Sequence, residues 1–152
     1  MRYSGCVLEL YTWDSPNGEK VHIAVEEMGL EVTVRPVDLN RGEQHEDWFL
    51  ELNPAGQVPV LIDHEAPGGK VTLRDSATIL MYLADKTGLL IPVEPASRYE
   101  ALNWLMFQGA QIGPVFGLFH QLFIGDGTAV PSVLRVLRSR IERVYATIDR
   151  AL

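Results

Sequence analysis

The sequence is poor in cysteine: Cys6 is the only one among 152 residues. An internal disulfide is therefore excluded, and so is dithiol exchange by a Cys-x-x-Cys pair of the chain itself. The absence of disulfides is typical of proteins in a reducing compartment, and we expect a cytoplasmic location. Because Cys6 precedes the first predicted strand, we interpret it as an inert thiol.

Clustered positive charge is also missing. The chain has 13 lysines and arginines against 20 acidic residues, which gives a net charge of −7. Nonspecific binding to nucleic acid needs a basic face that displaces counterions from phosphates, so we predict no nucleic-acid partner. The balance changes sign in residues 131–152, where five arginines oppose Glu142 and Asp149. An anionic ligand is favoured beside this last segment.

The sequence also lacks metal-ligand spacing and a clear membrane-spanning stretch. Its histidines are dispersed at His22, His45, His64 and His120, without the short intervals of a metal motif. Residues 101–125 carry no charged side chain, but polar amides, glycines and a proline interrupt them. We expect no secretory signal, because the first residues lack a charged region followed by a sustained apolar stretch. We therefore predict no metal, no membrane association, and a buried helix over residues 101–125.

The first 37 residues change from the period of a strand to that of a helix and back. Val7–Tyr11 is typical of a short buried strand, and Glu31–Val37 alternates with β-branched residues, which predicts a second strand. Between them we expect an amphipathic helix that ends at Gly29. Its apolar positions are Val21, Ala24, Val25 and Met28. Such a βαβ unit favours a right-handed crossover and a parallel strand pair.

Two more strands and a helix follow a polar stretch, residues 38–57, in which Trp48–Leu52 forms a short helical patch. Strands are predicted over Val60–Asp63 and Lys70–Leu73, and the intervening Pro-Gly-Gly has the turn chemistry of a hairpin. A helix over Ser76–Lys86 completes the order βαβ-ββα. This order predicts an α/β thioredoxin-like domain over residues 1–86.

The rest of the chain is helical in composition. Residues 87–95, which are rich in glycine and proline, are predicted to be a linker. Residues 96–152 then form an all-α domain. Its first helix spans Ala96–His120, with a kink or break at Gly113-Pro114, and its last helix starts near Pro131. The apolar stripe of this last helix consists of Leu134, Leu137, Ile141, Val144, Ile148 and Leu152.

The turn Ser15-Pro16-Asn17 stands where thioredoxins carry their redox cysteines, but it holds none. Any thiol chemistry must therefore use the thiol of a ligand, and glutathione would supply it. Free amides and the positive end of the dipole at a helix start favour an anion, so a thiolate beside Ser15 and Asn17 would be stabilised. Alternatively, these residues only cap the helix. Tyr11 is a second candidate to contact the sulfur, less favoured because it lies inside a strand.

Two later segments could bind a peptide-like ligand through the backbone. A proline directly before a strand can hold a cis bond, so Val58 ahead of Pro59 could turn its N–H and C=O outward to an extended peptide. A plain trans proline that opens the strand is the alternative. Asp75 and Ser76 stand at a helix start, where they could bind a ligand's carboxylate or simply cap the helix.

Taken in order, these motifs resemble the glutathione site of glutathione transferases. They are Ser15–Val21, Val37–Leu39 leading to Gln44, Asn53–Leu61, and Asp75–Leu83. The resemblance is to the nu class, which is the bacterial disulfide-bond reductase type and is similar to the fungal nitrogen-regulatory prion protein. It covers nearly the whole chain and is most specific before Lys86.

The resemblance implies a role for each matching residue. Ser15, which replaces the family's usual threonine, and Asn17 would face the sulfur of glutathione and act in catalysis. Asp75 would hold the γ-glutamyl end, although the family usually has the longer glutamate there. The glutathione-binding residues that it implies are Gln44, Val58, Pro59, Asp75, Ser76 and Arg135. Arg135 matches an arginine that the family directs toward the ligand, in some members across a dimer interface. Alternatively, Arg135 simply lies on a solvated helix face.

The implied activity is that of a glutathione transferase or a glutathione-dependent disulfide reductase. The partners would be glutathione, a small disulfide or electrophilic second substrate, and a second copy in a homodimer. The chain is shorter than the family's usual length, so we expect a truncated helical domain whose apolar face is covered by a partner. A noncatalytic binding or regulatory module is the alternative function.

Overall fold

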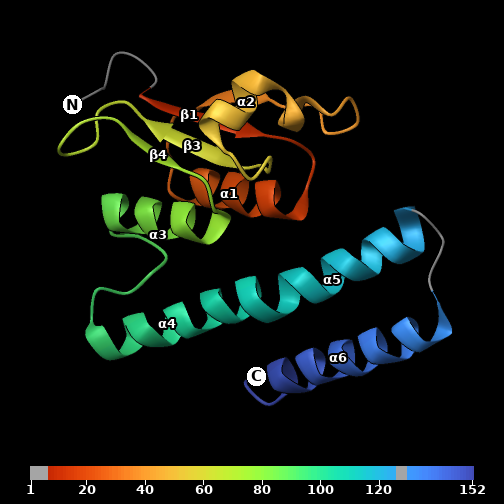
Figure 1. Cartoon of the computed structure of the whole chain (residues 1–152). Coiled ribbons are helices and arrows are strands. Elements are labelled where there is room, and N and C mark those ends of the chain that lie inside the picture. Colours follow the sequence, from red (N-terminus) through yellow and green to blue (C-terminus); the bar gives the residue numbers. More distant parts are fainter. Residues whose placement is uncertain (1–6, 126–129) are drawn as a thin grey trace. The chain divides into compact units, whose positions relative to one another are not determined.

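The computed structural model describes residues 7–125 and 130–152, so Cys6 lies outside the described residues (Figure 1). Its contacts divide the chain into two compact units, of which the first ends at Glu94 and the second spans Pro95–Leu152. The residues between Gly88 and Glu94, which fall within the predicted linker, form no helix or strand.

The first unit is built on a four-stranded mixed sheet. Its strands are β1 (Leu8–Thr12), β2 (Thr33–Pro36), β3 (Val60–Asp63) and β4 (Val71–Leu73), arranged in the order β2-β1-β3-β4. β1 and β2 are parallel, whereas β3 is antiparallel to both β1 and β4. This topology confirms the predicted α/β thioredoxin-like fold.

Helices cover both faces of this sheet (Figure 1). α1 (Pro16–Glu27) and α3 (Ser76–Thr87) lie on one face, and α2 (Asp47–Leu52) lies on the other, after the short 3₁₀ turn η1 (Glu43–His45). Each face has its own apolar cluster. The α1/α3 cluster contains Leu8, Leu10, Val21, Val25, Met28, Leu61, Ile79, Leu83 and Ala84. The α2 cluster contains Val37, Phe49, Val60 and Ile62.

A buried carboxylate ties the end of β3 to α3. Asp63 is fully buried, and its Oδ2 accepts hydrogen bonds from the Tyr82 hydroxyl at 2.6 Å and from the Lys86 ammonium at 2.8 Å. Its Oδ1 accepts from the backbone amide of Glu65 at 2.9 Å. These three donors compensate the burial of a charge that would otherwise be unfavourable.

The second unit consists of one long helical run and one returning helix (Figure 1). The run contains α4 (Pro95–Phe107), the π-helical turn η2 (Gln108–Ile112), α5 (Gly113–His120) and the π-helical turn η3 (Gln121–Gly125). α6 (Pro131–Asp149) packs beside it, and its start at Pro131 confirms the predicted helix start. No described helix is long and apolar enough to cross a membrane.

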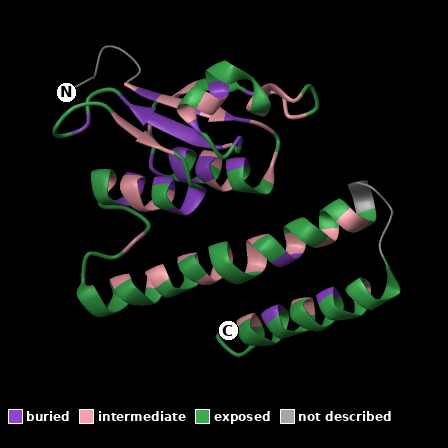
Figure 2. Cartoon of the chain, in the orientation of Figure 1, coloured by how far each residue is buried: buried purple, intermediate pink, exposed green. Residues whose placement is uncertain are grey.

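The irregularity expected at Gly113-Pro114 takes the form of a π-helical turn that directly precedes this pair. Pro114 falls in the first turn of α5, where its missing amide costs no hydrogen bond. The expectation of a buried helix was wrong, because within the described part of residues 101–125 only Val115 is buried (Figure 2). Trp104 and Met106, for example, are exposed.

Candidate functional site

The first candidate element is the N-terminus of α1. Ser15 is the N-cap, and its Oγ accepts a hydrogen bond from the backbone amide of Gly18 at 3.2 Å. Pro16 occupies the first helical position, where its fixed φ suits a helix start. Asn17 follows in the same turn and is exposed. A serine hydroxyl has one donor and two acceptor positions, so the cap leaves the Ser15 proton available to a ligand.

Sequence reasoning missed how tightly this turn is packed. Gly18 is buried, and a Cβ atom placed on it would lie 2.5 Å from Thr12 Oγ1 and 2.7 Å from the carbonyl oxygen of Trp13. A glycine three residues after a capping serine, at the end of a strand, is the sequence signal that could have indicated this. Gly18 therefore lets the start of α1 sit directly on the end of β1.

Tyr11, the alternative contact for a sulfur, lies elsewhere. Its ring packs against the α2 cluster, and its hydroxyl is 3.5 Å from Glu9 Oε2. Burial, followed by the nearby Glu9 carboxylate, raises the pKa of Tyr11 above its ordinary value. α1 packs on the opposite face of the sheet through Val21 and Val25. The structure therefore places the Tyr11 side chain on the face away from α1.

The second element is the loop before β3. The Val58–Pro59 peptide bond is cis, Pro59 is fully buried, and Val58 is half-buried. Asn53, which is also buried, organises the loop: its Nδ2 donates to the carbonyl oxygen of Gln57 at 2.7 Å, and its Oδ1 accepts from the amide of Ala55 at 3.1 Å. Asn53 belongs to the sequence motif, but it is not among the predicted site residues.

Gln44 lies against the same loop. A Cβ atom on Gly56 would be 3.2 Å from the Gln44 carbonyl oxygen and 2.9 Å from Nδ1 of His45, so the loop packs directly on η1. Gly56 has a φ of 61°, which favours glycine at this position. The side-chain Oε1 of Gln44 is buried and has no hydrogen-bond partner within the described chain. Buried polar atoms normally have a partner, so this acceptor suits the N–H group of a ligand.

The third element is the N-terminus of α3. Asp75 is exposed and is the N-cap: its Oδ1 accepts from the amides of Ala77 at 2.9 Å and Thr78 at 3.1 Å. Ser76 is buried at the first helical position. Burial lowers the pKa of Lys20, and the Asp75 carboxylate opposes that shift. This electrostatic interaction links α1 to the start of α3.

The sheet topology brings the three elements to one edge. Ser15 follows the carboxyl end of β1, and Pro59 precedes β3, whose Val60 pairs with Tyr11 in an antiparallel register. β4 is antiparallel to β3 and therefore runs in the direction of β1, so Asp75 follows β4 at the same edge. A ligand site at the strand ends is typical of sheets with helices packed on their faces.

Arg135 lies in the other unit. It is exposed on α6 and lines a groove of about 690 Å³ with aromatic residues of the long helical run. These aromatic residues are Phe116, Phe119 and Phe123. Its contact with a ligand held by the first unit remains a prediction.

The described residues contain no group of three or more His, Cys, Asp or Glu side chains that could hold a metal ion. The groups available to a ligand at this edge are the capped starts of α1 and α3, the cis-proline loop and the Gln44 amide. A helix start favours an anion and the loop presents backbone groups, so together these elements suit an extended, negatively charged peptide.

A four-stranded thioredoxin-like sheet with a cis-proline loop, followed by a helical unit, defines the architecture of glutathione transferases. A family model described as "Glutathione S-transferase, N-terminal domain" matches residues 14–86. The disulfide-bond oxidoreductase YfcG of Escherichia coli is 32% identical over 148 residues, which are 96% of this chain and 69% of that protein. The chain therefore belongs to the glutathione transferase family.

Two other proteins extend the comparison. Protein URE2 of Eremothecium gossypii is 33% identical over 91% of this chain, which covers 40% of that protein. A crystal structure of a glutathione transferase from Pseudomonas putida, with one glutathione disulfide bound per subunit, has a TM-score of 0.91 and 34% identity. That match covers 95% of this chain and 64% of the Pseudomonas putida chain. The chain therefore spans about two thirds of that transferase and less than half of URE2.

Proposed function

We propose that the first unit binds glutathione and uses its thiolate to reduce small disulfides. The convergence of Ser15, Val58 and Asp75 at one sheet edge carries this proposal. The Ser15 hydroxyl and the Asn17 amide would donate hydrogen bonds to the sulfur, and the positive end of α1 would favour its negative charge. A charge-assisted hydrogen bond contributes about 1.5–3 kcal/mol, which lowers a thiol pKa by roughly one to two units.

The remaining residues would hold the peptide. Val58 would pair with the cysteinyl backbone in front of Pro59, and the unpartnered Oε1 of Gln44 would accept from a peptide N–H near the glycine end. Asp75 and Ser76 would bind the γ-glutamyl end. The Oδ1 of Asp75 already caps α3, so its second oxygen is the one assigned to the ligand amine.

The reaction would run in two thiol–disulfide exchanges. The bound thiolate attacks one sulfur of the substrate, a mixed disulfide forms, and the other sulfur leaves as a thiolate that takes up a proton. A second glutathione thiolate then attacks the glutathione sulfur of the mixed disulfide and releases the second substrate thiol. Two glutathiones are oxidised to one glutathione disulfide, and the substrate disulfide is reduced to two thiols.

Two relatives support disulfide reduction over conjugation. YfcG is a disulfide-bond oxidoreductase, and the Pseudomonas putida structure contains bound glutathione disulfide. Attack of the same thiolate on an electrophilic carbon remains the second candidate reaction. A noncatalytic glutathione-binding module is the third candidate, because the chain is also similar to protein URE2.

Replacing the amide that faces the sulfur should separate these functions. We expect Asn17→Ala to lower kcat/KM for a small disulfide, such as bis(2-hydroxyethyl) disulfide, about tenfold, because one hydrogen bond to the thiolate is lost. The exposed Asn40, in the loop before η1, provides the matched variant Asn40→Ala, which should leave turnover unchanged. Coupled assays with glutathione reductase would measure the rates.

Calorimetric titration with reduced and oxidised glutathione completes the test. Heat of binding without turnover would favour the noncatalytic module. No binding at millimolar glutathione would contradict the proposed site altogether, and equal rates for Asn17→Ala and wild type would remove Asn17 from the mechanism.

We also propose that the chain forms a homodimer. The second unit exposes large apolar side chains, including Tyr99, Trp104, Met106 and Tyr145, and soluble proteins rarely leave large apolar patches uncovered. Sedimentation velocity at micromolar concentration should give the mass of two chains. A monodisperse species of 17.0 kDa that binds no apolar dye would contradict this expectation.

A further inference from the structure

The turn between β1 and α1 carries two side chains that have no part in the proposed exchange, Trp13 and Asp14. They directly precede Ser15, the residue proposed to face the sulfur, and consecutive Cα atoms are only about 3.8 Å apart. The turn is held in place at the Trp13 carbonyl oxygen, which accepts a hydrogen bond from the Thr12 hydroxyl at 3.4 Å and packs against the buried Gly18. Trp13 and Asp14 therefore stand beside the place where a disulfide would approach the thiolate.

Neither side chain is engaged elsewhere in the described structure. Asp14 is exposed, and its carboxylate has no hydrogen bond or ion pair with any residue of 7–125 or 130–152. Trp13 is half-buried, and no described aromatic ring or cation is paired with its indole. An aromatic face next to a carboxylate suits an ammonium group, which is attracted both to the ring and to the negative charge.

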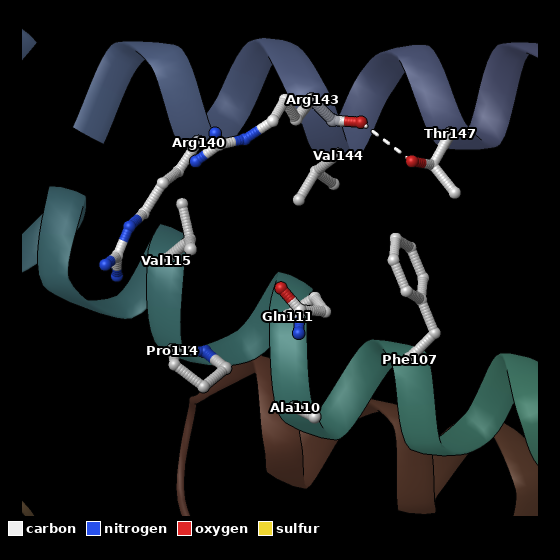
Figure 3. Close-up of a pocket in the computed structure, with 9 residues that line it drawn as sticks. All are labelled: Phe107, Ala110, Gln111, Pro114, Val115, Arg140, Arg143, Val144 and Thr147. Atoms are coloured by element: carbon white, nitrogen blue, oxygen red, sulfur yellow. Dashed lines mark hydrogen bonds between the residues drawn. The ribbon is translucent and has the colours of Figure 1, made fainter. Parts of the chain in front are cut away.

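The net charge of the first unit acts in the same direction. Residues 1–94 contain seven lysines and arginines against sixteen acidic residues, which gives a net charge of −9. The balance reverses in residues 95–152, where six arginines oppose four acidic residues and two of them, Arg140 and Arg143, line a groove of the helical unit (Figure 3). A field of one sign raises the local concentration of ligands of the opposite sign. The first unit therefore favours the approach of a cation.

Two cations of the first unit flank the proposed site, and each interacts with another group. Lys20, on α1, interacts with the Asp75 carboxylate, which opposes the effect of burial on the Lys20 pKa. The Nε of Arg74 donates to the carbonyl oxygen of Leu52 at 2.5 Å. Neither pairs with Asp14, whose charge is left to a substrate.

We propose that this site selects small disulfides that carry ammonium groups, and that Trp13 and Asp14 determine the selection. The inference rests on the proposed function, because it assigns the second substrate of the same exchange. One ammonium arm of the disulfide would lie against the Trp13 ring beside the Asp14 carboxylate while the glutathione thiolate attacks a sulfur atom. Two glutathiones are oxidised to one glutathione disulfide, and the substrate is reduced to two aminothiols.

Three disulfides of similar length and different charge test this selection. Cystamine carries two ammonium groups, bis(2-hydroxyethyl) disulfide is neutral, and dithiodiglycolate carries two carboxylates. For each, kcat/KM at saturating glutathione is divided by the rate constant of the uncatalysed reaction with glutathione, which removes its intrinsic reactivity. At low salt we expect this quotient to be about tenfold higher for cystamine than for the neutral disulfide, and lowest for the dianion. Salt of about 1 M, where the screening length is about 3 Å, should reduce the preference.

Single variants locate the selection. Asp14→Asn and Trp13→Leu should each lower the ratio of cystamine to neutral disulfide about threefold, because a charge pair or a cation–π contact is lost. A ratio of two substrates on one variant cancels any change in thiolate reactivity. Glu27→Gln removes the same charge at the far end of α1, about 18 Å along the helix, and should leave the ratio unchanged.

The outcomes separate this inference from the proposed function. Equal quotients for the three disulfides, or equal losses in Asp14→Asn and Glu27→Gln, would overturn the inference and leave glutathione-dependent reduction intact. No turnover of any of the three would contradict the proposed function, and the inference would fall with it. Circular dichroism would verify that each variant is folded. Should Trp13→Leu unfold, the exposed position of Asp14→Asn and the wild-type series still decide the result.

Discussion

Asp63→Ala is expected to lower the free energy of unfolding by about 3 kcal/mol. The substitution leaves the Lys86 ammonium and the Tyr82 hydroxyl without the buried acceptor that now lies 2.8 and 2.6 Å away. Breaking a buried ion pair on one side costs about 3–5 kcal/mol, and the low end applies because the Lys86 side chain is 33% exposed and can rehydrate. Urea unfolding followed by circular dichroism measures the change.

Glu65 provides the matched control for this variant. It is exposed, two residues from Asp63, and carries the same charge. Glu65→Ala should change the free energy of unfolding by less than about 0.5 kcal/mol. Equal effects of the two variants would mean that the lost charge, and not the buried hydrogen bonds, accounts for the change.

The same carboxylate gives the chain a defined acid sensitivity. Burial raises the pKa of Asp63, but the hydrogen bonds from Lys86, Tyr82 and the Glu65 amide outweigh burial and hold the pKa below its ordinary value. The folded state therefore binds this proton more weakly than the unfolded state. The stabilisation is present above the unfolded pKa of about 3.9 and is lost as the pH falls through the lower folded pKa. The stability difference between wild type and Asp63→Asn should therefore shrink below about pH 4.

Tyr82 has the opposite dependence. Burial, together with the hydrogen bond to Asp63, raises the pKa of Tyr82 to about 12. A raised pKa means that the folded state holds this proton more tightly. The contribution is complete below the unfolded pKa of about 10 and disappears as the pH rises toward 12. The Asp63 network therefore stabilises the first unit across the neutral range.

Gly18→Ala is expected to lower the free energy of unfolding by about 3 kcal/mol, the upper end for overpacking at a tight contact. The new methyl group would lie 2.5 Å from Thr12 Oγ1 and 2.7 Å from the Trp13 carbonyl oxygen, so the first turn of α1 must move away from β1. The Ser15 cap moves with it, and disulfide turnover should fall with stability. Urea unfolding and the glutathione-coupled assay measure the two effects.

Gly117 in α5 is the matched control. A Cβ atom there meets no atom within 4 Å, so Gly117→Ala should stabilise the helix by up to about 1 kcal/mol. Opposite signs for the two glycine substitutions would show that contact, and not helix propensity, decides the outcome at Gly18. A stabilised Gly18→Ala variant would mean that the close approach to Trp13 is not required.

The helices and strands whose ends are marked by a proline, a glycine turn or a capping side chain could be predicted from the sequence. β3 begins and ends where predicted because Pro59 and the Pro67-Gly68-Gly69 turn mark its limits. α1 and α3 begin directly after Ser15 and Asp75, which cap them as their side-chain oxygens suggested. Strand ends without such signals were less accurate: β1 is shifted by one residue to Leu8–Thr12.

Features that depend on distant packing could not be predicted. Residues 101–125 looked like a buried helix because they are uncharged, yet burial depends on what packs against them, and composition does not contain that information. The close approach of Gly18 to Trp13 depends on the path of the turn between β1 and α1, and the unpartnered Gln44 oxygen depends on how η1 meets the loop before β3. The Ser15, Asn17 and Asp75 assignments came from the family resemblance, and they remain proposals.

The uneven burial of the two units determines how the chain opens. The sheet of the first unit lies between two apolar clusters, whereas the described part of the helical unit buries only Val115, Leu137 and Val144. Segments with few buried apolar side chains open locally at a lower free energy. Backbone amides of α4, α5 and α6 should therefore exchange with solvent deuterium through brief local openings. Those of β1 and β3 should exchange only when the whole sheet unfolds. A protease that cuts only opened chain would reach the helices first.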